Sequence, residues 1–272
     1  MRLFIFGLGY AASAIADASG WPVLATTRDG RAGTIRFDDD QAVRAGLASA
    51  THILSSVPPD ENGDPVLSRY GDAFTGQWLG YLSSTGVYGD AAGAWVDETA
   101  PIAGRRPARN AADAAWLALG ARVFRLPGIY GPGRSPLDRV ASGKAHRTGL
   151  ATQVFSRIHV ADIASGVVAG FTAPPGAYNL ADDHPCNQDA VIEHAAALLG
   201  LSPPPIVPLD SLSPAARAFY AENRRVANGK AKRVLGWQPR YPDYRLGLRA
   251  VSAITSPTAA SAAPPIVSAD HR

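Results

Sequence analysis

Cysteine is almost absent from this sequence, and the patterns that would bind a metal ion or cross a membrane are missing as well. Cys186 is the only cysteine among 272 residues, which excludes a disulfide within the chain and fits a reducing compartment. No Cys and His cluster has metal-ligand spacing. No run approaches the roughly 18 apolar residues of a membrane span, and charged Asp17 and Arg28 interrupt the N-terminal segment too early for a signal peptide. We therefore expect a cytoplasmic protein with no metal site and no membrane segment.

Lysine is also scarce, so arginine supplies most of the basic charge. The only lysines are Lys144, Lys230 and Lys232, against 26 Lys and Arg residues in total. The formal net charge of +3 is small, and no basic stripe with interleaved aromatic side chains occurs. We expect a small-molecule substrate and no nucleic-acid partner.

The first residues of the chain carry a dinucleotide-binding pattern. An apolar run of strand length ends at Phe6, and the pattern G-x-G-x-x-A follows it. Gly7 would allow a tight turn, and Gly9 would let a diphosphate approach the backbone N–H groups of Tyr10 and Ala11 at the start of a helix. A glycine turn in an α/β protein without a nucleotide is the alternative, because this pattern alone is weakly specific.

A second strand is expected at residues 21–27, and the residue that follows it bears on the choice between NAD and NADP. NAD-binding proteins commonly place an acidic residue here for the ribose 2′-OH, whereas a basic residue suits the 2′-phosphate of NADP. This sequence offers Arg28, with Asp29 one position later. We expect NADP in preference to NAD, the alternative being that Arg28 is a solvated loop charge.

Apolar runs alternate with helical segments along the chain. Further strands are expected at residues 34–37, 51–57, 78–83 and 122–126, and helices at residues 41–47, 65–74 and 188–199. This alternation predicts an α/β fold with a doubly wound parallel sheet, the Rossmann fold. Ligands bind beyond the carboxyl ends of such strands, where Gly7, Arg28, Ser56 and Ser84 would gather.

Five motifs in order indicate a particular family. They are YLSSTGVYGD at 81–90, WVDE at 95–98, FRLPGIYGPG at 124–133, RIHVAD at 157–162 and LGWQP at 235–239. Together with the N-terminal pattern they resemble the extended short-chain dehydrogenase/reductase family, which includes NAD-dependent sugar-nucleotide epimerases and dehydratases. The resemblance implies oxidoreductase or epimerase-like chemistry on a carbonyl or hydroxyl group. It also implies a substrate lobe and, as in many relatives, a homodimer.

The resemblance assigns roles to individual residues. Ser84 falls on the catalytic Ser/Thr position, although it could also simply satisfy the end of a strand. Gly128 falls beside the cofactor. Family dehydratases carry an Asp-Glu pair where this chain has Thr85 and Gly86, so 4,6-dehydration is not expected.

The Tyr-x-x-x-Lys pair of the family is missing. The register of the flanking helix places Arg105 at the tyrosine position and Arg109 at the lysine position. The residues four positions before the three lysines are Val140, Val226 and Asn228, so the pair occurs nowhere in the chain. Arg109 could still offer positive charge near the nicotinamide ribose, but a guanidinium is effectively never a proton donor at neutral pH.

Two functions are compatible with this departure. In the first, the protein is still an oxidoreductase or epimerase, and another group supplies the proton; Tyr88, Tyr130 and His159 are candidates by residue type, although each also fits a structural role. In the second, the protein is a catalytically inactive NADP(H)-binding sensor that reports cofactor state to a partner. The sequence leaves both open.

The arginines at 105, 106 and 109 could clamp a phosphate or carboxylate, or form a solvated loop. Arg134 and Arg157 are further polar candidates on the substrate side. We expect a Rossmann domain at residues 1–133 and 157–182, a small substrate lobe at 134–156 and 183–255, and a disordered tail at 256–272, which is rich in Ala, Ser and Pro.

Overall fold

The structure, a computed structural model, describes residues 1–255. The predicted disordered tail, residues 256–272, lies outside the described residues. Between residues 1 and 255, no helix is long and apolar enough to cross a membrane.

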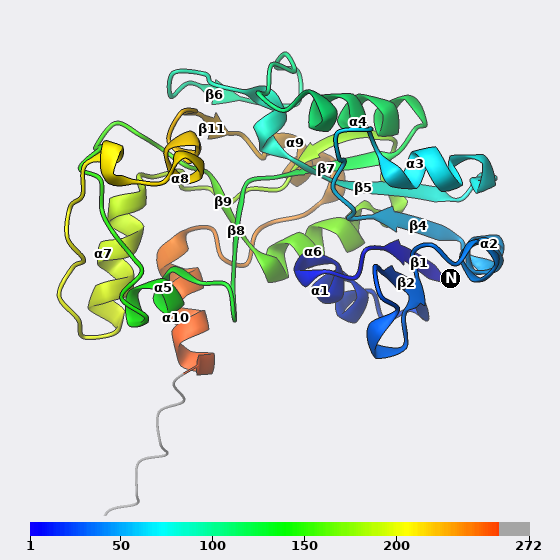
Figure 1. Ribbon diagram of the computed structural model, residues 1–272, viewed down its shortest axis with the longest axis horizontal. Helices are drawn as coiled ribbons and strands as arrows, with labels where there is room; N and C mark the ends of the chain where they lie inside the picture. Colours follow the sequence, from blue (N-terminus) through cyan, green and yellow to red (C-terminus); the bar gives the residue numbers. More distant parts are fainter. Residues whose placement is uncertain (256–272) are drawn as a thin grey trace, which may run out of the picture.

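A seven-stranded parallel sheet forms the centre of the molecule (Figure 1). Its strands, in spatial order, are β3 (Ile35–Arg36), β2 (Val23–Thr27), β1 (Leu3–Phe6), β4 (His52–Ser55), β5 (Trp78–Ser84), β7 (Arg122–Leu126) and β10 (Gly176–Asn179). The strand order reverses between β1 and β4, which places the ligand crevice of a doubly wound fold at the carboxyl ends of these strands. The predicted fold class is confirmed.

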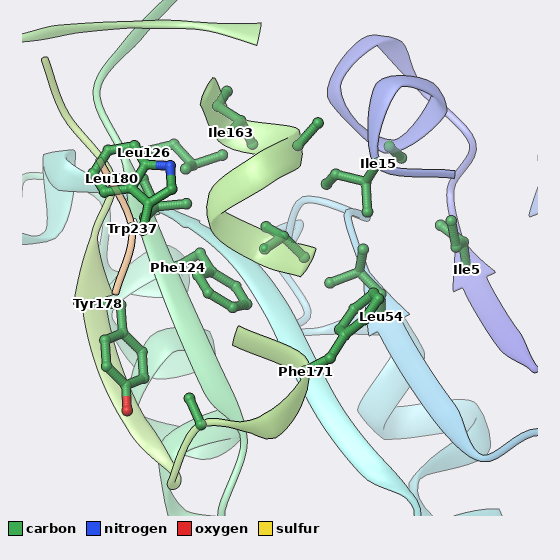
Figure 2. Packing of buried hydrophobic residues seen from close by; sticks show 14 of the residues in the cluster. Ile5, Ile15, Leu54, Phe124, Leu126, Ile163, Phe171, Tyr178, Leu180 and Trp237 are labelled. Atoms are coloured by element: carbon green, nitrogen blue, oxygen red, sulfur yellow. The ribbon is translucent and has the colours of Figure 1, made fainter. Parts of the chain in front are cut away.

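Helices cover both faces of the sheet because successive side chains of a buried strand point to opposite faces. Leu3 and Ile5 pack with α1 (Tyr10–Ser19), α6 (Val160–Ala169) and α9 (Gly229–Leu235) in one core (Figure 2). Phe4 and Phe6 pack with α2 (Asp40–Ser49), α3 (Pro65–Tyr70) and α4 (Pro107–Ala118) in the other. The continuous apolar runs of the sequence are therefore strands buried on both sides.

A third core lies beside the sheet and combines α5 (Pro136–Ala141), α7 (Gln188–Leu198) and α10 (Tyr244–Thr255). Figure 1 shows these helices and α8 (Pro214–Phe219) grouped at one end of the molecule. Two small parallel ladders adjoin the group, β8 (Gly128–Tyr130) with β9 (Arg157–His159) and β6 (Trp95–Val96) with β11 (Arg225–Val226). The short 3₁₀ helices are Arg31–Gly33, Gly71–Ala73, Thr85–Tyr88, Gly170–Thr172 and Leu209–Ser211. The division into two domains stays a prediction.

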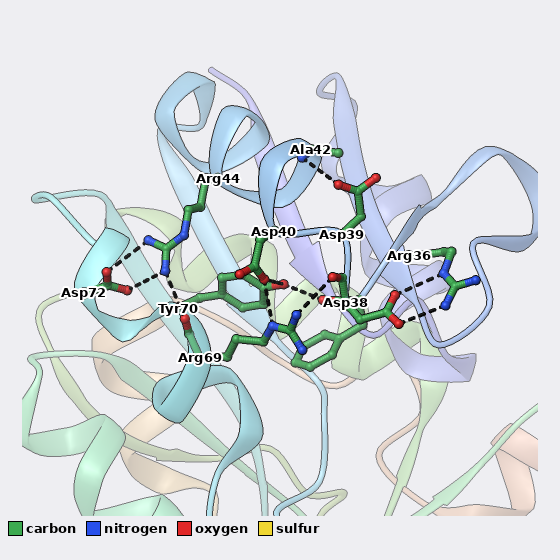
Figure 3. Close-up of polar contacts among 10 residues, drawn as sticks. Arg36, Asp38, Asp39, Asp40, Ala42, Arg44, Arg69, Tyr70 and Asp72 are labelled. Carbon is green, nitrogen blue, oxygen red and sulfur yellow. Dashed lines mark hydrogen bonds and ion pairs between the residues drawn. The ribbon is translucent and has the colours of Figure 1, made fainter.

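Exposed arginine–aspartate pairs lie on the surface where β3, α2 and α3 meet (Figure 3). The Arg44 Nη1 lies 3.0 Å from the Asp72 carboxylate, and the Arg69 Nε lies 2.7 Å from that of Asp40. Exposed pairs of this kind add about 0 to 1 kcal/mol each to the free energy of unfolding. They serve below as a reference for a buried pair.

Candidate cofactor and substrate site

The glycine turn after β1 has the shape that the sequence pattern predicts. Gly7 has φ +80°, and a Cβ at this position would stand 3.0 Å from the Val57 Cγ2. The Ser56 hydroxyl donates to the Gly7 carbonyl, which fixes the turn against the end of β4. No atom lies within 4 Å of the place where a Cβ on Gly9 would stand. The approach to the start of α1 is therefore open.

The N-terminus of α1 has no side-chain cap, so its first backbone N–H groups, including those of Tyr10 and Ala11, face this open approach. The Tyr10 side chain also contacts a distant loop, because its hydroxyl donates to the Pro132 carbonyl at 2.9 Å. A Cβ on Gly131 would stand 2.6 Å from the Tyr10 oxygen. The first helix and the 131–133 loop are therefore in direct contact.

Arg28 follows β2 and is exposed, and within residues 1–255 it forms neither a hydrogen bond nor an ion pair. Asp29, by contrast, is engaged within its own turn. Its carboxylate accepts a hydrogen bond from the Thr27 hydroxyl at 3.1 Å and lies 3.7 Å from the Arg31 guanidinium. Of the two residues that could contact the cofactor ribose, Arg28 is therefore unpaired among the described residues and Asp29 is not.

A cavity of about 870 Å³ lies beyond the carboxyl ends of β5 and β7. Ser84, Arg105, Arg109 and Gly128 of the predicted site line it, whereas Tyr88 does not. Its wall is strongly basic, since only two carboxylates, Asp138 and Glu222, accompany seven arginines, which are Arg105, Arg106, Arg109, Arg134, Arg139, Arg157 and Arg224. The cavity suits an anionic ligand.

Ser84 ends β5 at the edge of this cavity. Its hydroxyl accepts a hydrogen bond from the Gly86 N–H at 3.1 Å and remains partly exposed. The hydroxyl hydrogen stays available to a ligand oxygen, as the predicted catalytic role requires.

The arginines near the start of α4 differ in their partners. Arg105 donates to the Glu222 carboxylate at 2.6 Å and to the Ala218 carbonyl at 2.8 Å. The side chains of Arg106 and Arg109 line the cavity and form no hydrogen bond or ion pair with any residue that the structure describes. The predicted clamp of three arginines is therefore divided into one tethered and two available side chains.

Tyr88 was a candidate proton donor, and its surroundings argue against that role. Its side chain is only 3% exposed, its hydroxyl donates to the Asn179 Oδ1 at 2.7 Å, and the Arg125 Nη1 donates to it at 3.1 Å. Arg125 in turn forms a buried ion pair with Asp113 at 2.7 Å. The Tyr88 phenol is thus part of a structural network, because it is buried and already bonded on both sides.

The phenols that line the cavity are Tyr130 and Tyr220. Burial raises the pKa of both, most strongly that of Tyr130. Tyr220 was missed by sequence reasoning because no motif marks it. His159 caps α6, because its ring Nδ1 accepts a hydrogen bond from the Ala161 N–H. Burial lowers the pKa of its imidazole to about 4, so it carries no proton to donate at neutral pH, and it does not line the cavity.

A pH dependence of stability follows from Asp182, which is 1% exposed. Burial raises the pKa of its carboxyl to about 7, even though Arg157 lies near. The pKa of this carboxyl is higher in the folded protein than in the unfolded protein. The free energy of unfolding therefore falls as the pH rises from about 4 to 7, and it is regained as the pH falls back through this range. Asp182→Asn should therefore raise the free energy of unfolding at pH 8 by up to about 4 kcal/mol, and the gain should shrink toward pH 4. Urea titrations across this range measure it.

Asp210→Asn is the control for this experiment, because Asp210 is exposed. It should leave the pH profile of stability unchanged. Equal profiles for Asp182→Asn and the wild-type protein would contradict the assignment.

Solved structures with the same fold come from several organisms. A functionally unknown conserved protein from Silicibacter pomeroyi DSS is 42% identical, with 93% of this chain and 98% of that chain covered and a TM-score of 0.81. Human epimerase family protein SDR39U1, solved with NADPH, is 17% identical, with 93% and 99% covered and a TM-score of 0.73. A Bacillus anthracis dTDP-glucose 4,6-dehydratase in complex with NAD is 16% identical, with 93% and 95% covered and a TM-score of 0.74.

Curated relatives match only part of the chain. Protein YeeZ of Escherichia coli K12 is 32% identical over 176 residues, which are 60% of this chain and 58% of YeeZ. A 3-diazoavenalumate denitrifying reductase from Streptomyces sp is 30% identical over 138 residues, 46% of this chain and 45% of that protein. The matches thus span about half the length of these relatives. No protein-family model matches the chain.

The chain has the same fold as human SDR39U1 and the Bacillus anthracis dehydratase, so the fold that the sequence resemblance implies is confirmed. The chain belongs to the same family as the functionally unknown Silicibacter pomeroyi protein, which it matches over nearly its whole length.

Proposed function

We propose that this protein binds NADP(H) and acts as an oxidoreductase or epimerase-like enzyme on a carbonyl or hydroxyl group of an anionic small molecule. The observation that carries the proposal is the basic cavity at the carboxyl ends of the strands, with Ser84 at its edge. Structural neighbours hold NAD or NADPH in this fold, which supports a nicotinamide cofactor.

The residues around the glycine turn fit such a cofactor. The open space at Gly9 and the uncapped start of α1 would receive the diphosphate, with Gly7 and Ser56 shaping the turn. Arg28 would receive the 2′-phosphate of NADP, since it is exposed and unpaired within residues 1–255. When bound, the nicotinamide supplies or accepts the hydride.

The residues of the chain then position the substrate. Ser84 donates a hydrogen bond to the reacting oxygen, and Arg109 places positive charge where relatives of this type carry the lysine. Gly128 lies in the cavity wall beside them. Tyr220 is our choice for the proton donor, because the hydroxyl of Tyr130, the other phenol in the wall, is buried against Gly247 of α10.

A cofactor-binding protein without catalysis is the second candidate, and one observation favours it. Arg105, at the position of the usual catalytic tyrosine, is tied to Glu222 and carries no transferable proton at neutral pH. A screen of carbonyl compounds for NADPH consumption distinguishes the two candidates. Turnover that Ser84→Ala reduces supports the enzyme, and tight NADPH binding without any turnover supports the sensor.

Arg28→Ala tests the choice of cofactor. It should weaken NADPH binding about tenfold or more, since a charge-assisted contact to the phosphate is lost, and leave NADH binding unchanged. Titration of nicotinamide fluorescence measures both affinities. Arg31→Ala is the matched control, because Arg31 already faces Asp29. Equal losses for NADPH and NADH would contradict a 2′-phosphate contact.

A further inference from the structure

Glu222 already places a carboxylate inside the basic cavity, between two arginines that are distant in sequence. The Arg105 Nε donates to its Oε1 and the Arg224 Nη1 to its Oε2, each at 2.6 Å. Its side chain is 11% exposed. Burial opposes its ionisation, but the hydrogen bonds from Arg224 and Arg105 prevail and hold the pKa of the carboxyl below its usual value. The two guanidinium groups therefore form a carboxylate site that the protein fills with its own side chain.

This carboxylate site adjoins the hydroxyl that we assign to the reacting oxygen. A Cβ on Gly86 would stand 3.2 Å from the Ser84 Oγ and 4.0 Å from the Arg224 Nη2. The hydroxyl and the guanidinium thus flank the same glycine. A ligand held by both groups would have its anionic group only a few bonds from its reacting carbon.

Glu222 neutralises only part of the positive charge nearby. Arg106 and Arg109 line the same cavity and lack a protein partner in the described part of the chain. An entering anion is therefore attracted to this wall before it competes with Glu222.

From these contacts, and resting on the function proposed above, we propose that the substrate is a small carboxylic acid whose carboxylate replaces that of Glu222 between Arg105 and Arg224. The exchange trades one carboxylate for another of the same geometry, so it needs no rearrangement of the arginines. Each guanidinium donates to a different carboxylate oxygen, and a neutral amide has only one oxygen to accept such a bond.

The exchange would also loosen the segment 213–222. Glu222 follows α8, and Arg105 additionally binds the Ala218 carbonyl at 2.8 Å. The Gln153 side chain donates to the Glu222 carbonyl at 2.7 Å. When the Glu222 side chain leaves Arg105, one of the contacts that hold residues 213–222 over the cavity is lost.

Glu222→Gln tests the proposal, because it removes the competing charge and keeps the size of the side chain. Isothermal titration of the NADPH-saturated protein should show glutarate binding about tenfold tighter to this variant than to the wild-type protein, whereas binding of glutaramide should not change. Adding Arg105→Gln should abolish the gain. Glu193→Gln is the matched control, since it breaks the Arg147–Glu193 pair outside the cavity, and it should change neither affinity.

Unchanged or weaker glutarate binding by a folded Glu222→Gln variant would overturn the proposal. A gain for inorganic phosphate without a gain for glutarate would overturn it in favour of a phosphate ligand. Hydrogen exchange of the wild-type protein supplies a measurement without any variant: saturating glutarate should speed exchange in residues 213–222, and unchanged or slower exchange would count against the proposal. If NADPH did not bind but the glutarate results were as expected, the proposed function would be wrong and the carboxylate site would stand.

Discussion

Gly9→Asp should abolish NADPH binding, with a loss of affinity of at least about 100-fold, while the protein stays folded. Gly9 has φ −96° and ψ −170°, values that any residue adopts, and no atom lies within 4 Å of the position of a new Cβ. An aspartate at this position would even cap α1, which favours the helix. The same carboxylate would stand where we place the diphosphate, and the two negative charges would repel each other.

Nicotinamide fluorescence measures the loss, and thermal unfolding shows that the fold is kept. Gly9→Asn is the matched control, because it has the same size without the charge, and it should bind NADPH more tightly than Gly9→Asp. Affinity of Gly9→Asp within a few-fold of wild type would mean that the diphosphate does not approach α1, and the cofactor site would have to be sought elsewhere.

Arg125→Met should lower the free energy of unfolding by about 3 to 5 kcal/mol. Arg125 is 2% exposed and Asp113 is completely buried, so removal of the guanidinium leaves an uncompensated carboxylate in the core. The Ser83 hydroxyl, which donates to Asp113 at 2.6 Å, cannot replace a positive charge. Urea unfolding monitored by tryptophan fluorescence measures the change.

Arg44→Met removes an exposed arginine–aspartate pair of similar length and should cost less than about 1 kcal/mol. The comparison separates burial from pairing, since both variants lose the same chemical group. Similar losses for the two variants would show that the Asp113 site is hydrated in solution.

The cofactor end of the molecule could be read from the sequence because its signals are local. The run that ends at Phe6 and the glycines that follow are neighbours in the chain, and the structure has β1 ending at Phe6 and α1 beginning at Tyr10, as expected. The strand expected at residues 51–57 is shorter, His52–Ser55, and the helix expected at 65–74 ends at Tyr70 before a 3₁₀ turn. End positions depend on packing that a single chain read in order does not reveal.

The substrate end could not be read in this way because its contacts join distant segments. Arg105 and Glu222 are 117 positions apart, and no pattern near either residue announces the other. Tyr88 sits in a motif of the family type, but its burial against Asn179 became visible only in three dimensions. The cluster of arginines at 105, 106 and 109 indicates an anionic ligand. The structure separates the tethered Arg105 from Arg106 and Arg109, whose side chains have no hydrogen bond or ion pair among residues 1–255.

The hydroxyl of Tyr10 bonds the first helix to the 131–133 loop, and a side chain at Gly131 would collide with it. A cofactor seated on α1 and a substrate seated against this loop would therefore act on one packed unit. Thermodynamic linkage makes the effect reciprocal: whatever factor the cofactor adds to the affinity for the substrate, the substrate adds to the affinity for the cofactor. Tyr10→Phe, which deletes only the hydroxyl, is the natural substitution for measuring that factor.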